Sequence, residues 1–179
     1  CQPDEKSLKS ALERPAYQGI PIVTKEELLA GFPADAVIVE THELEQDKDA
    51  LLFAKAGYHI HSDKPCGASN EVFAELMETA RKNNLVFQNG YMYRYNPYVM
   101  EIKKQLKNGE FGDIISVEAQ MNCFHPAEFR QWMENFPGGM MFFLGCHLID
   151  LIFSIQGKPK KIIPLNKCTK TDGVTANDF

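Results

Sequence analysis

The sequence predicts an α/β protein: part of a doubly wound parallel sheet, followed by part of an α+β domain with a mainly antiparallel sheet. Short strand-like segments at residues 35–40, 58–62 and 85–87, with helical patterns between them, predict the first part. Residues 113–122 alternate apolar and polar side chains, which predicts a strand with one solvent-exposed face in the second part. We therefore expect two incomplete domains, at residues 1–89 and 90–179.

In the first part, a helix is expected at residues 5–14, and Thr24-Lys25-Glu26-Glu27 has the form of a capping box that opens another. The continuous apolar run at 35–40 is typical of a strand covered on both faces. A helix to about residue 56 and a strand at 58–62 complete a βαβ unit. Ser69 caps the next helix, whose apolar stripe is formed by Val72, Phe73, Leu76, Met77 and Ala80.

In the second part, Asn96 and Pro97 form an N-cap and first-turn pair for a helix that Gly109 ends. After the strand at 113–122, a long loop leads to an apolar helix at about 140–156. Gly157 ends this helix, and a further strand is expected at 160–167.

Composition excludes several classes of protein. The chain has 179 residues, and 24 acidic against 19 basic side chains give a net charge of −5, so we expect no nucleic-acid partner. No apolar stretch approaches the roughly 20 residues that span a bilayer. The five cysteines form no CxxC pair, which favours reduced thiols in the cytoplasm. Because the sequence starts at a cysteine and shows no stop signal at its end, we expect it to be an internal part of a longer protein.

Three segments concentrate reactive side chains. The first runs from His59 to Cys66, at the carboxyl end of an expected parallel strand, where ligands collect in open α/β sheets. Lys64 in this segment is a candidate hydrogen-bond donor or proton carrier. The alternative is a surface turn in which Asp63 and Lys64 are only solvated.

The second segment lies within the apolar helix, where His147 and Asp150 are three residues apart and project from one side. A carboxylate near an imidazole suits a general acid or base. A hydrogen-bonded histidine of the core is the alternative. Upstream, Gly138-Gly139 is either an ordinary loop or a place where backbone approaches a ligand.

The third segment, Tyr91 to Pro97, offers Tyr93 and Arg94 for a pocket that takes a polar substrate, or else packing and a helix cap. The scattered histidines and cysteines also permit a metal site, but no pair has a zinc-finger spacing, so no metal ligand is assigned.

Five stretches taken together resemble the Gfo/Idh/MocA family of NAD(P)-dependent oxidoreductases. They are DAVIVET (35–41), AGYHIHSDKP (56–65), GYMYRYNP (90–97), GEFGDIISVE (109–118) and GGMMFFLGCHLID (138–150). They occur in the family's order and spacing across nearly the whole chain.

The resemblance implies a Rossmann domain joined to an α+β domain whose sheet forms the substrate wall and an interface between identical subunits. It implies hydride transfer between NAD or NADP and a sugar, cyclitol or related polyol. Lys64 and His147 would be catalytic, and Thr41, Asp63, Lys64 and Pro65 would shape the nicotinamide site. Tyr93, Arg94 and His147 would contact the substrate. The chemistry is coherent, because removing hydride from a carbinol also requires an acceptor for the hydroxyl proton.

The sequence also departs from the family pattern. The glycine-rich phosphate-binding turn would lie before Cys1, so we expect this chain alone to bind the dinucleotide poorly and to be inactive by itself. The family's T-P-x-x-x-H reads Thr41 to Gln46 here, without the Pro and the His, and Asp63 stands for a Glu. Phe143 occupies the position, four residues before His147, where many members carry an Asp.

Three functions are therefore compared: a dehydrogenase of this family, a non-catalytic ligand-binding or regulatory relative, and a metal-assisted hydrolase or lyase. Phe143 and Gln46 motivate the second, and the scattered His and Cys residues motivate the third.

Overall fold

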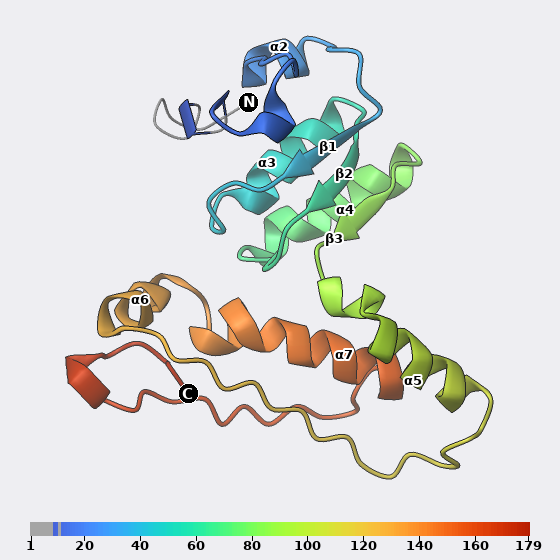
Figure 1. Cartoon of the computed structure of the whole chain (residues 1–179), viewed down its shortest axis with the longest axis vertical. Helices are drawn as coiled ribbons and strands as arrows, with labels where there is room; N and C mark the ends of the chain where they lie inside the picture. Colours follow the sequence, from blue (N-terminus) through green and yellow to red (C-terminus); the bar gives the residue numbers. More distant parts are fainter. Residues whose placement is uncertain (1–8, 11) are drawn as a thin grey trace. The chain divides into compact units, whose positions relative to one another are not determined.

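The computed structural model describes residues 9, 10 and 12–179, which divide into two compact units. The first unit comprises the chain up to Ser62 together with Ser69–Gln88, and the second comprises Asp63–Ala68 and Asn89–Phe179 (Figure 1). Of the helix expected at 5–14, residues 5–8 and 11 lie outside the described residues, and Lys9, Ser10 and Leu12 are helical.

The first unit is built on a three-stranded parallel sheet in the order β1-β2-β3, which confirms the α/β class. β1 pairs with β2 in a register from Ala36 opposite His59 to Val39 opposite Ser62. Its elements are η1 (Pro15–Tyr17), α2 (Lys25–Leu29), β1 (Ala36–Val39), α3 (Gln46–Lys55), β2 (His59–Ser62), α4 (Asn70–Lys82) and β3 (Phe87–Asn89), of which Asn89 belongs to the second unit.

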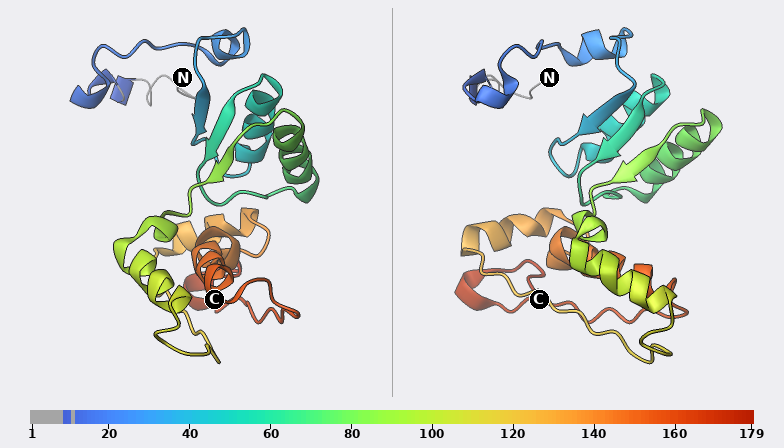
Figure 2. Two further views of the ribbon diagram at one scale, coloured as in Figure 1. Left: turned by 90° about the vertical axis from the view of Figure 1, so that its right-hand side faces the viewer. Right: turned by 45° about the vertical axis from the view of Figure 1, so that its right-hand side comes forward.

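The core of the first unit lies between the sheet and the two helices α3 and α4 (Figure 2). Val39 and Ile60 are each 2% exposed, and Leu76 of α4 is fully buried against them. Side chains of a strand point alternately to opposite faces, and Ile38 on the other face is 73% exposed. The expectation that residues 35–40 are covered on both faces is therefore wrong for the described residues, because α3 and α4 pack against the same side.

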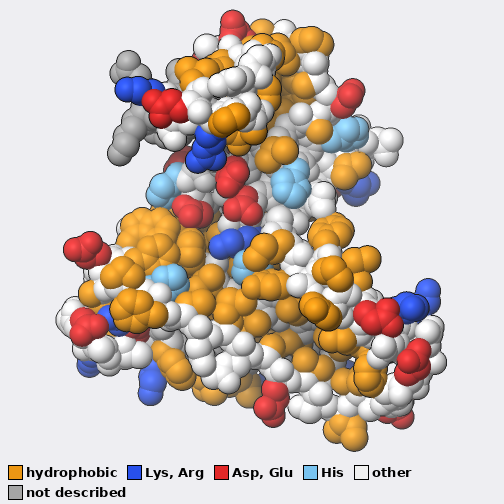
Figure 3. All heavy atoms as spheres, viewed as in Figure 1, with side chains coloured by type: hydrophobic (Ala, Val, Ile, Leu, Met, Phe, Trp, Pro, Cys, Tyr) orange, Lys and Arg blue, Asp and Glu red, His pale blue; other side chains and the backbone are white. Residues whose placement is uncertain are grey.

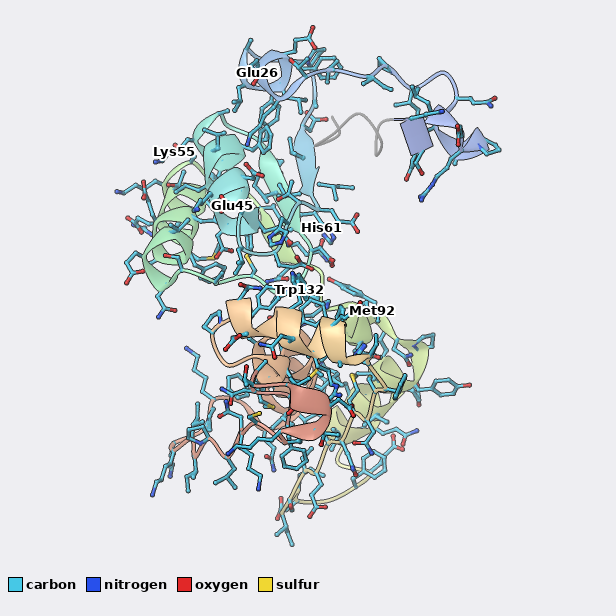
Figure 4. The ribbon with its side chains drawn as sticks, turned by 90° about the vertical axis from the view of Figure 1, so that its left-hand side faces the viewer. Glu26, Glu45, Lys55, His61, Met92 and Trp132 are labelled. Atoms are coloured by element: carbon cyan, nitrogen blue, oxygen red, sulfur yellow. The ribbon has the colours of Figure 1, made fainter. Side chains whose placement is uncertain are left out.

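Local signals set the helix boundaries of this unit. Thr24 and Glu27 form both hydrogen bonds of the predicted capping box at α2, and Ser69 accepts from the backbone of Val72 at α4. The Tyr58 hydroxyl donates to the carbonyl of Leu28 at 2.6 Å and so anchors α2 to the core. Lys55, labelled in Figure 4, forms an ion pair that joins α3 to α4.

The second unit is mainly helical. Its elements are η2 (Met92–Tyr95), α5 (Pro97–Lys107), α6 (Ala127–Trp132), η3 (Met133–Asn135), the π-helical turn η4 (Met141–Gly145), α7 (Cys146–Gln156) and η5 (Thr171–Gly173). The predicted Asn96 cap is present, since its side chain accepts from the backbone of Tyr98. The apolar helix expected at 140–156 begins with a π turn, a feature that is rare and is often found at functional sites.

The antiparallel sheet expected in this unit is not present in the described residues. Residues 113–122 and 160–167 are extended but form no strand. Alternation identifies which side chains share a face, whereas a strand also needs a neighbour that completes its backbone hydrogen bonds. The described part of the chain provides such a neighbour only for Lys167, which exchanges two backbone hydrogen bonds with Phe179.

Apolar side chains of these extended segments lie at the surface: Ile115 is 95% exposed and Leu165 81%. Figure 3 shows hydrophobic side chains gathered over the second unit. An open hollow of about 820 Å³ is lined by Ile114 and Ile115 and by Ile152 and Phe153 of α7, among others. Within the described residues, no helix combines the length and apolarity that crossing a membrane requires.

Candidate active site in the second unit

Lys64 lies in the segment Asp63–Ala68, which directly follows β2 and packs as part of the second unit. Pro65 behind it is buried, and the Lys64 side chain is half-buried. Its ammonium nitrogen donates to the backbone carbonyl of Phe143 at 3.3 Å and lies 4.3 Å from the centroid of the Phe143 ring. The solvated-turn alternative therefore does not describe Lys64, whose charged end contacts the helical stretch that carries His147.

His147 stands in the first turn of α7 and is only 5% exposed. The ring of Tyr93 meets the imidazole edge-to-face with centroids 5.1 Å apart, and the ring of Tyr91 does so at 6.1 Å. Its Nδ1 atom is buried and has no hydrogen-bond partner among the described residues. A buried polar atom without a partner is costly, so this nitrogen is a position where a ligand group can supply the missing hydrogen bond.

The surroundings of His147 favour its uncharged form. Burial lowers the pKa of His147 below the ordinary 6.5, and the positive charge of Lys64 lowers it further, against the opposing effect of Asp63 and Asp150. Burial also raises the pKa of the Cys146 thiol. It raises the pKa of Tyr91 to about 12, with smaller contributions from neighbouring groups. At neutral pH, His147 is therefore an imidazole with a free lone pair, beside a protonated phenol and thiol.

Arg94 and Asp150 join η2 to α7. The guanidinium Nε donates to both carboxylate oxygens of Asp150, at 3.0 and 2.8 Å, and Nη2 donates to Oδ1. The Asp150 side chain is 7% exposed and that of Arg94 is 52% exposed. Hydrogen bonding to Asp150 raises the pKa of Arg94. Since Tyr91 and Tyr93 both lie within three residues before Arg94 in sequence, this ion pair also helps to hold their rings beside His147.

Aromatic rings enclose the Phe143 side of the site. The Phe143 ring lies 5.5 Å from the rings of Phe129 and Trp132 and 5.6 Å from that of Phe136, measured between centroids. Trp132, at the end of α6, is labelled in Figure 4, as is Met92 of η2. These contacts fix the ring that faces Lys64.

The Gly138-Gly139 pair receives the C-terminal segment of the chain. The Met140 amide donates to the carbonyl of Asn177 at 2.8 Å. Gly139 has φ +54°, and a Cβ atom built on it would lie 2.2 Å from that same carbonyl oxygen. The sequence left open an ordinary loop or an approach of backbone to a ligand. The structure instead shows backbone of the protein itself close to Gly139, and an approach to a ligand stays a prediction.

A charged cluster holds the same C-terminal segment. Arg130 of α6 donates to the Asp178 carboxylate at 2.8 Å, and the Thr169 amide and hydroxyl each donate to it at 2.8 Å. The Asp178 side chain is 2% exposed. Burial alone would raise the pKa of Asp178, but the hydrogen bonds from Thr169 and Arg130 outweigh it and lower that pKa.

The residues predicted from sequence divide between the two units. Asp63, Lys64, Pro65, Tyr93, Arg94 and His147 lie in the second unit, whereas Thr41 is exposed in the first, between β1 and α3. Within the second unit the structure brings Lys64, Tyr93 and His147 to one site. Arg94 turns two of its nitrogens to Asp150, and its role in substrate binding stays a prediction, as do the cofactor-binding roles.

The histidines of β2 are engaged in the sheet region. His59 Nδ1 accepts from the Val86 amide at 2.9 Å, and His61 Nδ1 lies 3.4 Å from Gln88 Oε1. In the part of the chain that the structure describes, no group of three His, Cys, Asp or Glu side chains is placed to hold a metal ion.

Sequence reasoning placed Tyr91 and Asp150 near the chemistry but did not find the ion pair with Arg94. The signal was present, since a charged residue in an apolar helix needs a partner when it is buried. The sequence contains no comparable signal for the contact of Lys64 with Phe143, because the two residues are 79 positions apart and a phenylalanine does not require a charged partner.

Comparison with known proteins shows which family the chain resembles. Residues 99–174 match the family model described as the GFO/IDH/MocA C-terminal domain. The chain is 25% identical over 166 residues to the scyllo-inositol 2-dehydrogenase (NADP(+)) of Bacillus subtilis, covering 82% of this chain and 46% of that protein. It is 26% identical over 150 residues to the trans-1,2-dihydrobenzene-1,2-diol dehydrogenase of Bos taurus, covering 82% of this chain and 44% of that protein.

The fold is likewise similar to that of the WlbA dehydrogenase from Bordetella pertussis, crystallised with NADH and UDP-GlcNAcA. The TM-score is 0.70 at 22% identity, covering 88% of this chain and 46% of that one. These matches confirm the resemblance to the Gfo/Idh/MocA family of oxidoreductases that was found in the motifs of the chain. The chain spans less than half the length of the two curated relatives named above.

Proposed function

We propose that this chain carries the proton-handling residues of an NAD(P)-dependent dehydrogenase that oxidises a secondary alcohol of a sugar, cyclitol or related polyol. The relatives named above act, by their names, on an inositol and on a cyclic diol, and one was crystallised with a nucleotide sugar. Two of these names therefore describe the oxidation of a ring alcohol, and the third protein was crystallised with a sugar-like molecule, which together support this substrate class.

The observation that carries the proposal is the convergence of Lys64 and His147 within one compact unit. The Lys64 ammonium is fixed on Phe143, four residues before His147, and its charge lowers the pKa of the imidazole. An uncharged base next to a fixed positive charge is the arrangement that deprotonation of an alcohol requires.

In the oxidation, the imidazole of His147 accepts the hydroxyl proton of the substrate, and the Lys64 ammonium stabilises the negative charge that develops on the oxygen. The carbon–hydrogen bond breaks with its electron pair, and the carbon–oxygen double bond forms. The nicotinamide supplies the acceptor for that hydride. Tyr91, protonated at neutral pH, and Tyr93 wall the imidazole and exclude water from it.

The residues present fit the nicotinamide end of the cofactor. His147 of α7 has a buried Nδ1 without a partner among the described residues, the Lys64 donor contacts Phe143 of the preceding turn η4, and Asp63 and Pro65 flank that lysine. The printed sequence contains no G-x-G-x-x-G turn, so the residues that would hold the pyrophosphate are not among those described here. The choice between NAD and NADP is left to experiment.

The test uses the natural gene product that carries this sequence. Purified protein is given NAD⁺ or NADP⁺ with a panel of inositols, aldoses and cyclic diols, and nicotinamide reduction is followed by absorbance. We expect turnover with at least one substrate, and losses of 10²-fold or more in kcat for H147N and for K64A, as is usual for general acid–base groups. Absence of reduction and of cofactor binding across the panel would contradict the proposal and favour a non-catalytic relative.

Stability separates a catalytic from a structural lysine. K64A and H147N are unfolded in urea alongside the unmodified protein, and L148A in the same helix serves as a matched packing control. Turnover lost without a matching loss of stability supports the catalytic role, whereas equal losses in K64A would show a structural one. Assembly of identical subunits through the second unit and a cytoplasmic location stay predictions.

A further inference from the structure

Phe143 makes two separate contacts with one functional group. Its ring lies beneath the Lys64 ammonium at 4.3 Å, and its own backbone carbonyl accepts a hydrogen bond from that ammonium at 3.3 Å. The ring face attracts the cation through the quadrupole of the π system, and the carbonyl attracts it as a dipole. One residue therefore holds the lysine ammonium at a set distance from its ring and orients it by a hydrogen bond to its carbonyl.

The ring is itself fixed. Phe129, Trp132 and Phe136 surround it with centroids at 5.5 to 5.6 Å, so it cannot swing away without disturbing three neighbours. Its backbone belongs to the π-helical turn that immediately precedes α7. Phe143 is thus a rigid support for Lys64 on the stretch of chain that carries His147. We call its ring and carbonyl, which contact the ammonium, the seat of Lys64.

A phenyl ring holds a cation without adding a negative charge. A carboxylate at this position would attract the ammonium more strongly but would also offset its field, whereas the ring leaves the field of Lys64 acting on the imidazole. The other charged and titratable groups that face His147 are Asp63, Asp150, Tyr91, Tyr93 and Cys146. Both carboxylates raise the pKa of His147, so Lys64 is the nearby charge that opposes them.

We propose that Phe143 is a positioning residue for Lys64: its ring and its carbonyl together hold the ammonium beside His147. The link to catalysis rests on the proposed dehydrogenase function, but the seat itself can be measured without any substrate.

The first measurement is nuclear magnetic resonance of the protein after reductive methylation of its lysines with ¹³C-formaldehyde. The Lys64 signal is assigned by its absence in K64R. We expect its methyl protons to be shifted upfield by the Phe143 ring current. F143L should abolish this shift, F143Y should retain it, and F142L should leave it unchanged, because Phe142 stacks on Phe136 and is not the ring under Lys64.

The second measurement is the pH dependence of kcat/KM for the oxidation. With the ring removed in F143L and only the carbonyl left to hold it, Lys64 spends less time beside His147, so the pKa of His147 rises toward 6.5 and the acidic limb moves to higher pH. F143Y should restore the limb. A merely structural role for Phe143 would lower the rate without moving the limb.

Two results would overturn the inference. One is an unshifted Lys64 signal in the unmodified protein, a result that does not depend on whether any variant folds. The other is a Lys64 shift or an acidic limb that is the same in F143L and the unmodified protein. An unmodified protein that shows the Lys64 shift but reduces no nicotinamide would refute the proposed function while leaving the seat established.

Discussion

The ion pair between Arg94 and Asp150 allows a quantitative prediction, because its two partners are unequally buried. The Asp150 side chain is 7% exposed and the Arg94 side chain 52%. Replacing Arg94 with alanine leaves the buried Asp150 carboxylate without its partner. In a fully buried ion pair, such a loss lowers the free energy of unfolding by about 3–5 kcal/mol. Because Arg94 is half in water, screening reduces this figure, and we expect R94A to lower the free energy of unfolding by about 2–3 kcal/mol.

Replacing Asp150 instead removes the buried charge together with its partner interaction and leaves a guanidinium that water can solvate. We expect D150A to cost only about 1 kcal/mol. The double variant R94A/D150A should then be about as stable as D150A, so that its loss is about 2–3 kcal/mol smaller than the sum of the two single losses. Lys104, in the exposed pair with Glu101, is the matched control, and K104A should cause no resolvable change.

The assay is urea unfolding followed by circular dichroism, with the same m-value required of every variant. Equal costs for R94A and D150A, or a double variant equal to their sum, would refute the argument that unequal burial governs this pair. Since the pair also holds the tyrosines beside His147, R94A should lower kcat/KM in addition.

Three further changes test other parts of the structure, each by urea unfolding. G139A should lower the free energy of unfolding by more than about 2 kcal/mol, because it adds a clash with backbone to the cost of a positive φ. A Cβ atom at Gly138 would meet open space, so G138A should cost only about 1 kcal/mol. Equal effects of the two variants would be evidence against the close approach at Gly139. L76A should cost about 2–5 kcal/mol as a core truncation, and a smaller loss would show that the core repacks. Because the pKa of Asp178 is lowered in the folded protein, its carboxylate stabilises the fold above pH 3.8, and this effect is lost as the pH falls through the folded pKa. The difference in free energy of unfolding between D178N and the unmodified protein should therefore shrink below about pH 4. A difference that does not change with pH would contradict this.

Those features of the fold that depend on local chemistry were predictable from the sequence. Thr24, Ser69 and Asn96 each cap the helix that they were expected to cap, because a cap needs only a side-chain oxygen and the next turn. The parallel sheet also follows from the strand, helix and strand pattern around β1 and β2.

Those features that depend on a distant partner were not predictable in the same way. The alternation at residues 113–122 indicated which side chains share a face, but the described residues provide no neighbouring strand for it. Likewise, the apolar run at 35–40 did not reveal that α3 and α4 cover one face of the sheet and leave Ile38 exposed.

The candidate site shows the same division. Lys64 and His147 were found because reactive residue types stood at the end of a strand and in an apolar helix. Their supports, Phe143 and the pair of Arg94 with Asp150, were not assigned, since each joins segments more than 50 positions apart. Residue type therefore identified candidate chemical groups, and the tertiary contacts revealed what orients them.

The electrostatic coupling between Lys64 and His147 is tested most directly by titrating the His147 imidazole protons in the unmodified chain and in K64M. Methionine keeps the length of the side chain and removes its charge. The coupling predicts that His147 titrates below pH 6.5 in the unmodified chain and at a higher pH in K64M. Identical titration curves would show that Lys64 exerts no field on the imidazole, and the two residues would then not form one proton-handling site.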